Sequence, residues 1–143
     1  MNFPQQILTQ VRISTNVNTL WKYLTEPTNM QKWMGDESMA LQVHCSWELN
    51  STLRVSGFTS GHKFENKGRV LAFESNKSLK YSLLSSLSNL EETDLHASVI
   101  SFTMIEEAEA IVLYCDVSNF TTFEIYAHHN FYWPVALQMP KKL

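Results

Sequence analysis

The C-terminal third of the chain decides the fold, with HASVISFTMIE at residues 96–106, EAIVLYCDVS at 109–118 and TTFEIYAHHNFYWPVALQMP at 121–140. The first two segments alternate apolar and polar residues, which predicts two neighbouring strands joined by an acidic turn. In the third segment, apolar residues recur at helical spacing around much of the circumference, which predicts a long helix gripped by the sheet. Pro134 should kink this helix near its middle, because proline removes a backbone donor and clashes one turn back.

The period-two pattern begins well before these strands, at Ser38. It predicts four earlier strands, near residues 38–45, 52–60, 64–74 and 78–85. Because the connections are short, successive strands should pair in an antiparallel meander. Further upstream, Ile7 to Ile13 alternates as a first strand. Two short helices follow it, one with an apolar stripe from Val17 to Leu24 and one that begins at Pro27. Together these patterns predict one α+β domain over residues 1–143.

Six short segments, most of them an apolar pattern with one tryptophan, follow one another along the chain. They are Val17…Leu20-Trp21-Lys22-Tyr23-Leu24-Thr25, Met30-Gln31-Lys32-Trp33, Trp47-Glu48-Leu49-Asn50-Ser51, Gly68-Arg69-Val70, Leu79-Lys80-Tyr81 and Phe131-Tyr132-Trp133-Pro134-Val135-Ala136-Leu137. With these segments in this order, the chain resembles the START/Bet v 1-like (SRPBCC) superfamily. Within that superfamily it resembles the single-domain relatives of the Hsp90 ATPase activator's C-terminal domain. The resemblance implies a helix-grip fold, in which a curved antiparallel β-sheet wraps around a long C-terminal α-helix and two short helices lie between strands 1 and 2.

Two residues depart from the pattern of these relatives. Asn50 stands where they usually have glycine after the tryptophan-containing strand, which suggests a left-handed backbone that asparagine tolerates. Pro134 interrupts a helix that the relatives usually leave unbroken, and it could reshape the wall of a pocket beneath that helix.

The composition argues against several classes of function. The 143 residues carry a net charge of −3, and their eleven basic residues are scattered, so the chain has no electrostatic footprint for nucleic acid. No uncharged apolar stretch approaches 18 residues, which predicts no membrane span. The first residues lack the basic and apolar regions of a signal peptide, and we therefore expect a cytoplasmic protein. Cys45 and Cys115 are too few for a disulfide framework or a zinc site.

Several polar groups could carry chemistry, but none forms a convincing catalytic or metal-binding set. Glu124 and His128 share a face of the predicted helix, whereas His129 lies about 100° further around it. No third ligand is spaced to join these residues around one ion. The carboxylates at 91–94 and 106–109 fall in predicted turns, where water solvates them. We therefore expect no catalytic residue, no metal and no cofactor.

The sequence instead favours an internal, largely apolar pocket between the sheet and the C-terminal helix. A strongly curved sheet over one helix tends to leave space between the two, and the resemblance implies a small hydrophobic molecule or lipid as the occupant. The predicted lining lies on the more apolar face of each strand or on the helix stripe: Val55, Tyr81, Leu83, Phe102, Leu113, Tyr126 and Trp133. A one-residue error in strand parity would turn every strand residue to the other face.

Two other functions stay open at this point. The resemblance also implies a protein-interaction module of the Hsp90 co-chaperone kind, which an exposed apolar patch of more than a few hundred Å² would favour. An enzyme acting on an apolar or polycyclic substrate would need a histidine, glutamate or tyrosine with a perturbed pKa facing the pocket. The sequence determines neither the ligand, nor a protein partner, nor the oligomeric state.

Overall fold

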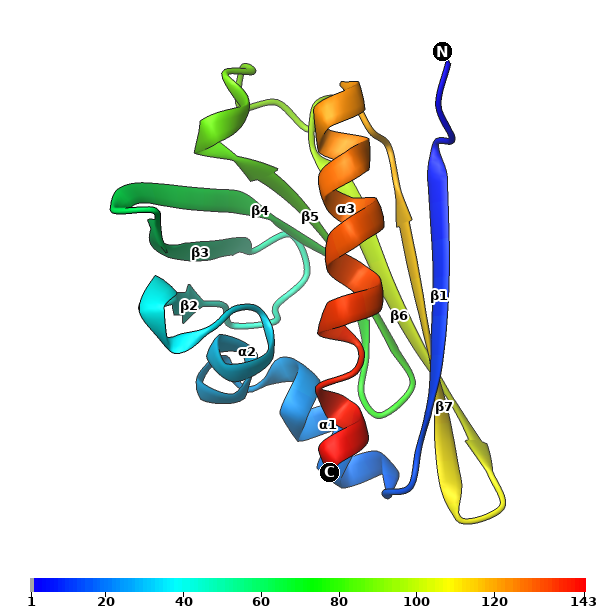
Figure 1. Cartoon of the computed structure of the whole chain (residues 1–143). Coiled ribbons are helices and arrows are strands. Elements are labelled where there is room, and N and C mark those ends of the chain that lie inside the picture. Colours follow the sequence, from blue (N-terminus) through cyan, green and yellow to red (C-terminus); the bar gives the residue numbers. More distant parts are fainter. Residues whose placement is uncertain (1) are drawn as a thin grey trace.

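The computed structural model describes residues 2–143 and contains a seven-stranded antiparallel sheet with the order β1-β7-β6-β5-β4-β3-β2. The strands are β1 (Gln6–Ile13), β2 (Gln42–His44), β3 (Thr52–Thr59), β4 (His62–Glu74), β5 (Ser78–Ser85), β6 (Ser98–Glu107) and β7 (Ala110–Ser118). Strands β2 to β7 are neighbours in chain order. The first strand joins the sheet at its far edge, where Gln6 to Ile13 of β1 lie opposite Ser118 to Ile111 of β7. The C-terminal helix lies across the face of this curved sheet (Figure 1), which confirms the predicted helix-grip fold.

The C-terminal helix α3 (Phe123–Ala136) is shorter than the predicted segment 121–140. It begins after Thr122, whose hydroxyl accepts a hydrogen bond from the backbone of Ile125 at 3.2 Å. The predicted kink near the middle of the helix is wrong, because Pro134 lies in the last turn and the helix ends two residues later. Proline has no N–H to offer the carbonyl one turn back, so the helix stops within a turn of it.

Two short helices connect β1 to β2 and pack beside the lower end of α3 (Figure 1). Helix α1 (Val17–Thr25) begins at Asn16, whose side chain accepts a hydrogen bond from Thr19. Helix α2 (Pro27–Trp33) has proline at its first position, as predicted. Both helices bury their apolar side chains in the same core as the sheet, so they close one end of the space beneath α3.

The predicted strand 38–45 shortens to β2, because the chain turns before it. Residues Glu37–Met39 form a 3₁₀ turn capped by the side chain of Asp36. Ala40 then adopts a left-handed backbone with φ of 48°, which is incompatible with an extended strand. The pairing of β2 with β3 is therefore confined to three residues at the edge of the sheet.

The loop between β2 and β3 is fixed by two residues with a left-handed backbone. Asn50 has φ of 65°, as its place in the sequence suggested, and its N–H donates to the carbonyl of Val70 at 2.8 Å. Trp47 has φ of 59°, and its indole N–H donates to the carbonyl of Thr25 at 2.7 Å. These bonds hold the Trp47 ring against Tyr81, with the ring centroids 5.9 Å apart.

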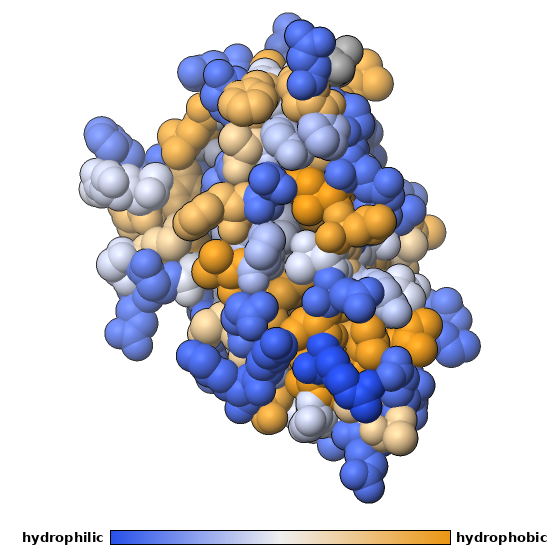
Figure 2. All heavy atoms as spheres, turned by 45° about the vertical axis from the view of Figure 1, so that its right-hand side comes forward, coloured by the Kyte–Doolittle hydropathy of each residue, from blue (hydrophilic) through white to orange (hydrophobic). Residues whose placement is uncertain are grey.

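Helix α3 is gripped on one side only. Among its residues, Trp133 and Ala136 are fully buried, whereas Phe123, Phe131 and Val135 are exposed. The expectation that the apolar circumference would be covered by the sheet is therefore wrong for the outward face. Figure 2 shows hydrophobic residues, in orange and tan, at the surface on this side of the molecule.

Candidate functional site

The seven predicted lining residues belong to one hydrophobic core between the sheet and α3. Those that are buried are Val55, Tyr81, Phe102, Leu113 and Trp133, and those that are half-buried against the same core are Leu83 and Tyr126. The five strand residues share the sheet face that points toward α3. Four of them lie opposite another core residue on a neighbouring strand, and Leu83 shares their face because it follows Tyr81 by two residues along β5. Their role as ligand contacts stays a prediction.

Five aromatic rings occupy the centre of this core, and we call them the aromatic cluster: Trp33, Trp47, Tyr81, Phe102 and Trp133. The ring centroid of Phe102 lies 5.8 Å from that of Trp133, 6.0 Å from that of Trp33 and 6.4 Å from that of Tyr81. Such separations are typical of packed aromatic pairs, which prefer about 4.5–7 Å. The space beneath this part of α3 is therefore filled by side chains in this structure.

The hydroxyl of Tyr81 is left without a hydrogen bond by this packing. Tyr81 is fully buried, and no described residue provides its hydroxyl with a partner. Burial raises the pKa of the phenol well above its usual value, and the nearby Tyr132, Cys115 and Cys45 add to the rise. A buried hydroxyl without a partner costs about 1–3 kcal/mol. Any bound group that hydrogen-bonds the Tyr81 hydroxyl recovers part of that cost.

A second unpartnered polar atom, the Oδ1 atom of Asn66, lies on the same face of the sheet. Asn66 is on β4, opposite Val55 of β3 and Ser85 of β5. Leu83, which lies between Tyr81 and Ser85 along β5, is only half-buried. Along this face, burial increases from the half-buried Leu83 to the fully buried Tyr81.

Two α3 side chains make interior hydrogen bonds. The hydroxyl of Tyr132 donates to the carbonyl of Met34 at 2.7 Å, and the indole N–H of Trp133 donates to Nδ1 of His129 at 2.9 Å. Because Nδ1 accepts this bond, His129 must be unprotonated at that atom. Burial, together with the neighbouring His128, lowers the pKa of His129 to about 4.

The two histidines of α3 stack on aromatic side chains of the same helix. His128 stacks on Tyr132, with ring centroids 5.6 Å apart, and burial lowers its pKa. Among residues 2–143, no group of three or more histidine, cysteine, aspartate or glutamate side chains is placed to hold a metal ion. Within the same residues, no helix is long and apolar enough to cross a membrane.

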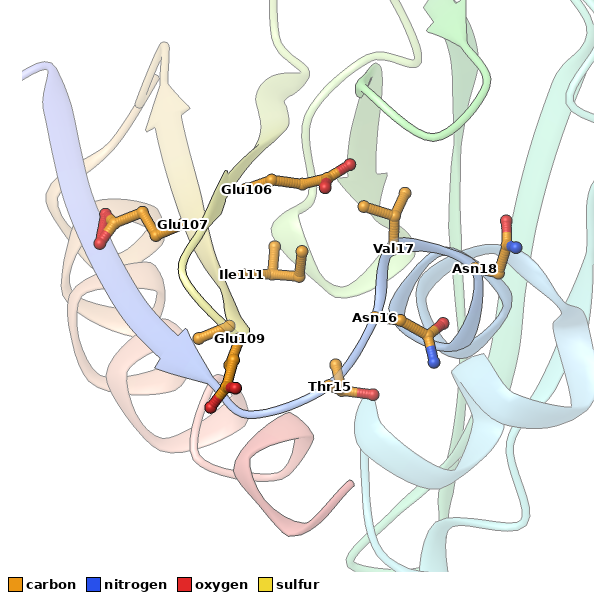
Figure 3. Close-up of a pocket in the computed structure, with 9 residues that line it drawn as sticks. Thr15, Asn16, Val17, Asn18, Glu106, Glu107, Glu109 and Ile111 are labelled. Carbon is orange, nitrogen blue, oxygen red and sulfur yellow. The ribbon is translucent and has the colours of Figure 1, made fainter.

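Two hollows lie at the surface. The first, of about 410 Å³, lies between the start of α1 and the turn joining β6 to β7, and Glu106, Glu107 and Glu109 contribute to its wall. Figure 3 shows that their carboxylates point in different directions, and that of Glu107 is paired with Arg12. The carboxylates do not converge on one point, so this hollow lacks the ligand arrangement of a cation site.

The second hollow, of about 330 Å³, lies on the opposite face of the sheet from α3. Two cations on β4 point into it and are already paired with the loop that covers it. Lys67 lies 3.7 Å from Glu92, and Arg69 lies 3.4 Å from Asp94. The opposite charges within each exposed pair cancel, so the hollow offers no excess charge to a ligand.

Three residues of the interior were not identified from the sequence: Trp33, Trp47 and Asn66. Trp33 belongs to the second of the two predicted short helices, and only the packing of α2 under α3 brings it to Trp133. Trp47 belongs to a loop without periodicity, so no local pattern could place its ring. Asn66 could have been found from strand parity, because it shares the face of Val55.

Comparisons with known proteins place these features in a wider group. A family model described as Activator of Hsp90 ATPase homolog 1-like protein matches residues 14–141. A crystal structure from Chromobacterium violaceum superimposes with a TM-score of 0.81 at 15% identity, covering 98% of this chain and 96% of the other. A solution structure from Cytophaga hutchinsonii has a TM-score of 0.75 at 22% identity, covering 98% and 94%.

A third solved structure is described as the Aha1 dimer from Colwellia psychrerythraea. It superimposes with a TM-score of 0.74 at 18% identity and covers 96% of this chain and 93% of the other. At these identities the likeness of the solved structures shows a shared fold. None of the curated proteins compared with the chain is significantly similar to it.

Proposed function

Because the chain belongs to the family of Activator of Hsp90 ATPase homolog 1-like proteins, we propose that it binds one small, largely apolar molecule between the sheet and α3. The observation that carries this proposal is the fully buried Tyr81 hydroxyl without a partner. The molecule would carry one hydroxyl or carbonyl oxygen that shares a hydrogen bond with Tyr81, while its apolar body packs against Val55, Leu83 and Trp133. Buried polar groups are nearly always hydrogen-bonded, which supports a polar group on the ligand at this point.

Room for the molecule would come from a movement of α3. Residues Phe123–Tyr132 of this helix include no fully buried side chain, since Trp133 and Ala136 supply that burial near its C-terminal end. Ile125, Tyr126 and Tyr132 are only partly buried against the core, so moving this part of α3 outward costs less buried apolar area than moving Trp133 would. The half-buried Leu83 would flank the opening.

The surroundings of Tyr81 favour binding over catalysis. The groups that influence its pKa are Tyr132, Cys115 and Cys45, and they include no carboxylate or histidine. Since burial raises the pKa of the phenol, it stays protonated at neutral pH and can donate a hydrogen bond. Burial also raises the pKa of Cys115, which keeps it a thiol and a poor nucleophile.

A second candidate function is the binding of a protein partner, which the exposed apolar side chains of α3 favour. Phe123 is 58% exposed, Phe131 77% and Val135 58%. The structural neighbour from Colwellia psychrerythraea is an Aha1 protein that forms a dimer.

Cys45 and Cys115 are both free thiols, which fits the reducing cytoplasm that we propose as the location.

The test compares two probes that differ by a single hydroxyl, 2-naphthol and naphthalene. Intrinsic tryptophan fluorescence and the melting temperature would be followed as each probe is added, since a ligand that binds only the folded state raises the melting temperature with its concentration. Tyr81→Phe should weaken 2-naphthol binding by about three- to tenfold, the value of one hydrogen bond, and leave naphthalene binding unchanged. Tyr114→Phe removes an exposed hydroxyl from β7 and serves as the matched control.

Two outcomes separate the parts of this proposal. If neither probe binds saturably, and native mass spectrometry of freshly purified protein finds no co-purified molecule, the ligand-binding proposal is wrong. If both bind but Tyr81→Phe has no effect on 2-naphthol, the ligand site stands and the role of the hydroxyl does not. Val55→Trp should weaken both probes by filling the space; the same change in a fully packed core would instead destabilise the fold by about 1–3 kcal/mol.

A further inference from the structure

The outward side of α3 carries a continuous apolar stripe, which we call the α3 stripe and define as Phe123, Ala127, Phe131 and Val135. The four residues are spaced four apart, so they follow one another along one side of the helix. Phe123, Phe131 and Val135 are 58%, 77% and 58% exposed, and Ala127 is half-buried. The face that carries this helix is the one turned toward the reader in Figure 2.

This composition is unusual for the solvent side of a helix, which normally carries charged and polar residues. With side-chain areas of about 150–250 Å² for an aromatic residue, the three large members of the stripe expose roughly 350 Å² of apolar surface. Patches of this size on a single chain commonly mark interaction sites. The stripe lies on the side of α3 away from Tyr81, so none of its residues is among the proposed ligand contacts.

We propose that the α3 stripe is the interface through which two copies of this chain pair, with their α3 helices antiparallel around a two-fold axis. The order of large and small side chains along the stripe is self-complementary. An axis level with position 129 sets Ala127 against the partner's Phe131, and Phe123 against the partner's Val135. Each phenyl ring then meets a smaller side chain, as ridges-into-grooves packing requires.

The charges around the stripe favour a second copy over a lipid surface. Residues 123–136 contain no lysine or arginine, whereas helices that lie on anionic membranes are rich in both. Glu124 flanks the stripe, and the antiparallel arrangement places the two copies of it about 15 Å apart along the helix pair. No like charges are therefore brought face to face in the paired state.

The area predicts a weak dimer. Two stripes, together with the exposed Glu124 and Pro134 beside them, would bury about 1,000 Å² in total, which is at the lower limit for a specific interface. An interface of this size fits a reversible equilibrium with a dissociation constant on the order of 10–100 μM. The chain should then be monomeric in dilute solution and dimeric when concentrated.

Sedimentation velocity from about 1 μM to about 1 mM protein tests this proposal. The wild-type protein should shift from monomer to dimer across that range. Phe131→Asp should raise the dissociation constant by about tenfold or more, because it places a charge at the centre of the interface. The matched control is Leu8→Asp, at a leucine on β1 that is 72% exposed and lies outside the stripe; it should dimerise as the wild type does.

A charge exchange tests the antiparallel register. Phe123→Glu and Val135→Lys should each weaken the dimer, whereas the double variant should restore it because each new charge then faces its opposite on the partner. The new glutamate lies at the N-terminus of α3 and the new lysine near its C-terminus, and both charges interact favourably with the helix dipole. Folding should therefore be retained, as circular dichroism would verify. A wild-type protein that stays monomeric at about 1 mM, or a Phe131→Asp variant that dimerises like the wild type, would overturn the proposal. Flotation with phosphatidylcholine vesicles that is lost in Phe131→Asp would assign the stripe to lipid instead.

Discussion

Acidification should destabilise the protein through His129. The indole N–H of Trp133 donates to Nδ1 of this residue at 2.9 Å. A proton on Nδ1 would turn the acceptor into a donor, break this bond and place a charge at a half-buried position on α3. The folded protein therefore resists protonation, and the pKa of His129 falls to about 4, first through burial and then through the neighbouring His128.

The size of the effect follows from proton linkage. The pKa of a histidine in the unfolded chain is near 6.5, so below that pH the unfolded state binds more protons than the folded one. Stability is therefore complete above about pH 6.5 and falls as the pH drops toward 4. With the folded pKa at about 4, the loss is about 2 kcal/mol at pH 5 and about 3 kcal/mol at pH 4. His128, whose pKa burial also lowers, adds a loss of the same sign.

Urea unfolding followed by tryptophan fluorescence, at pH values from 8 to 5, would measure this loss. His129→Gln keeps a carbonyl oxygen that can accept from Trp133 but cannot titrate, so most of the pH dependence should disappear. His62→Gln changes an exposed histidine at the start of β4 and should leave the pH dependence as it is. Equal unfolding free energies at pH 8 and pH 5 in the wild type, or an undiminished slope in His129→Gln, would refute the reasoning.

Three further substitutions test the packing and the surface. Trp133→Ala should lower the unfolding free energy by about 3–5 kcal/mol in urea titrations, because the side chain is 2% exposed; an unchanged stability would mean that α3 docks differently. Gly68→Ala should cost about 3 kcal/mol or more, since a Cβ atom there collides with the carbonyl oxygen of Ser82, whereas Gly61→Ala meets no atom and should cost less in the same titration. Replacing the three glutamates at 106–109 by glutamine should change stability by no more than about 0.5 kcal/mol per site and leave 2-naphthol binding intact; lost binding would move the site to that turn.

The sheet was predictable because its strands have one buried face. Phe102 on β6 lies between Ser101 and Thr103, and Cys115 on β7 lies between Tyr114 and Asp116. Because side chains alternate between the two faces of a strand, only one register turns both apolar residues inward. Both are buried in the structure, and β5, β6 and β7 lie within two residues of their predicted bounds. The length of the edge strand β2 was overestimated. The strand has only three residues, and so short a pattern does not show where the preceding turn ends.

The candidate site was less predictable, because it depends on contacts between distant segments. The parity of Tyr81 could be inferred, but its missing hydrogen bond depends on Trp47 and on α3 together. Likewise, the apolar circumference of α3 indicated burial without indicating which side the sheet would leave open. Phe131 and Trp133 look alike in the pattern, yet one is 77% exposed and the other 2%.

The pairing of β1 with β7 has a consequence for how the chain folds as it is made. Residues 6–13 pair only with residues 111–118, so the first strand emerges roughly a hundred residues before its partner. At the usual rates of synthesis, about 5–20 residues per second, that interval lasts roughly 5–20 s. Contacts between such distant segments also slow folding after release. For all of that time Ile7, Val11 and Ile13 have no sheet to join, and an unpaired apolar strand readily joins another chain. Newly made copies should therefore be most prone to aggregate before β7 has been synthesised.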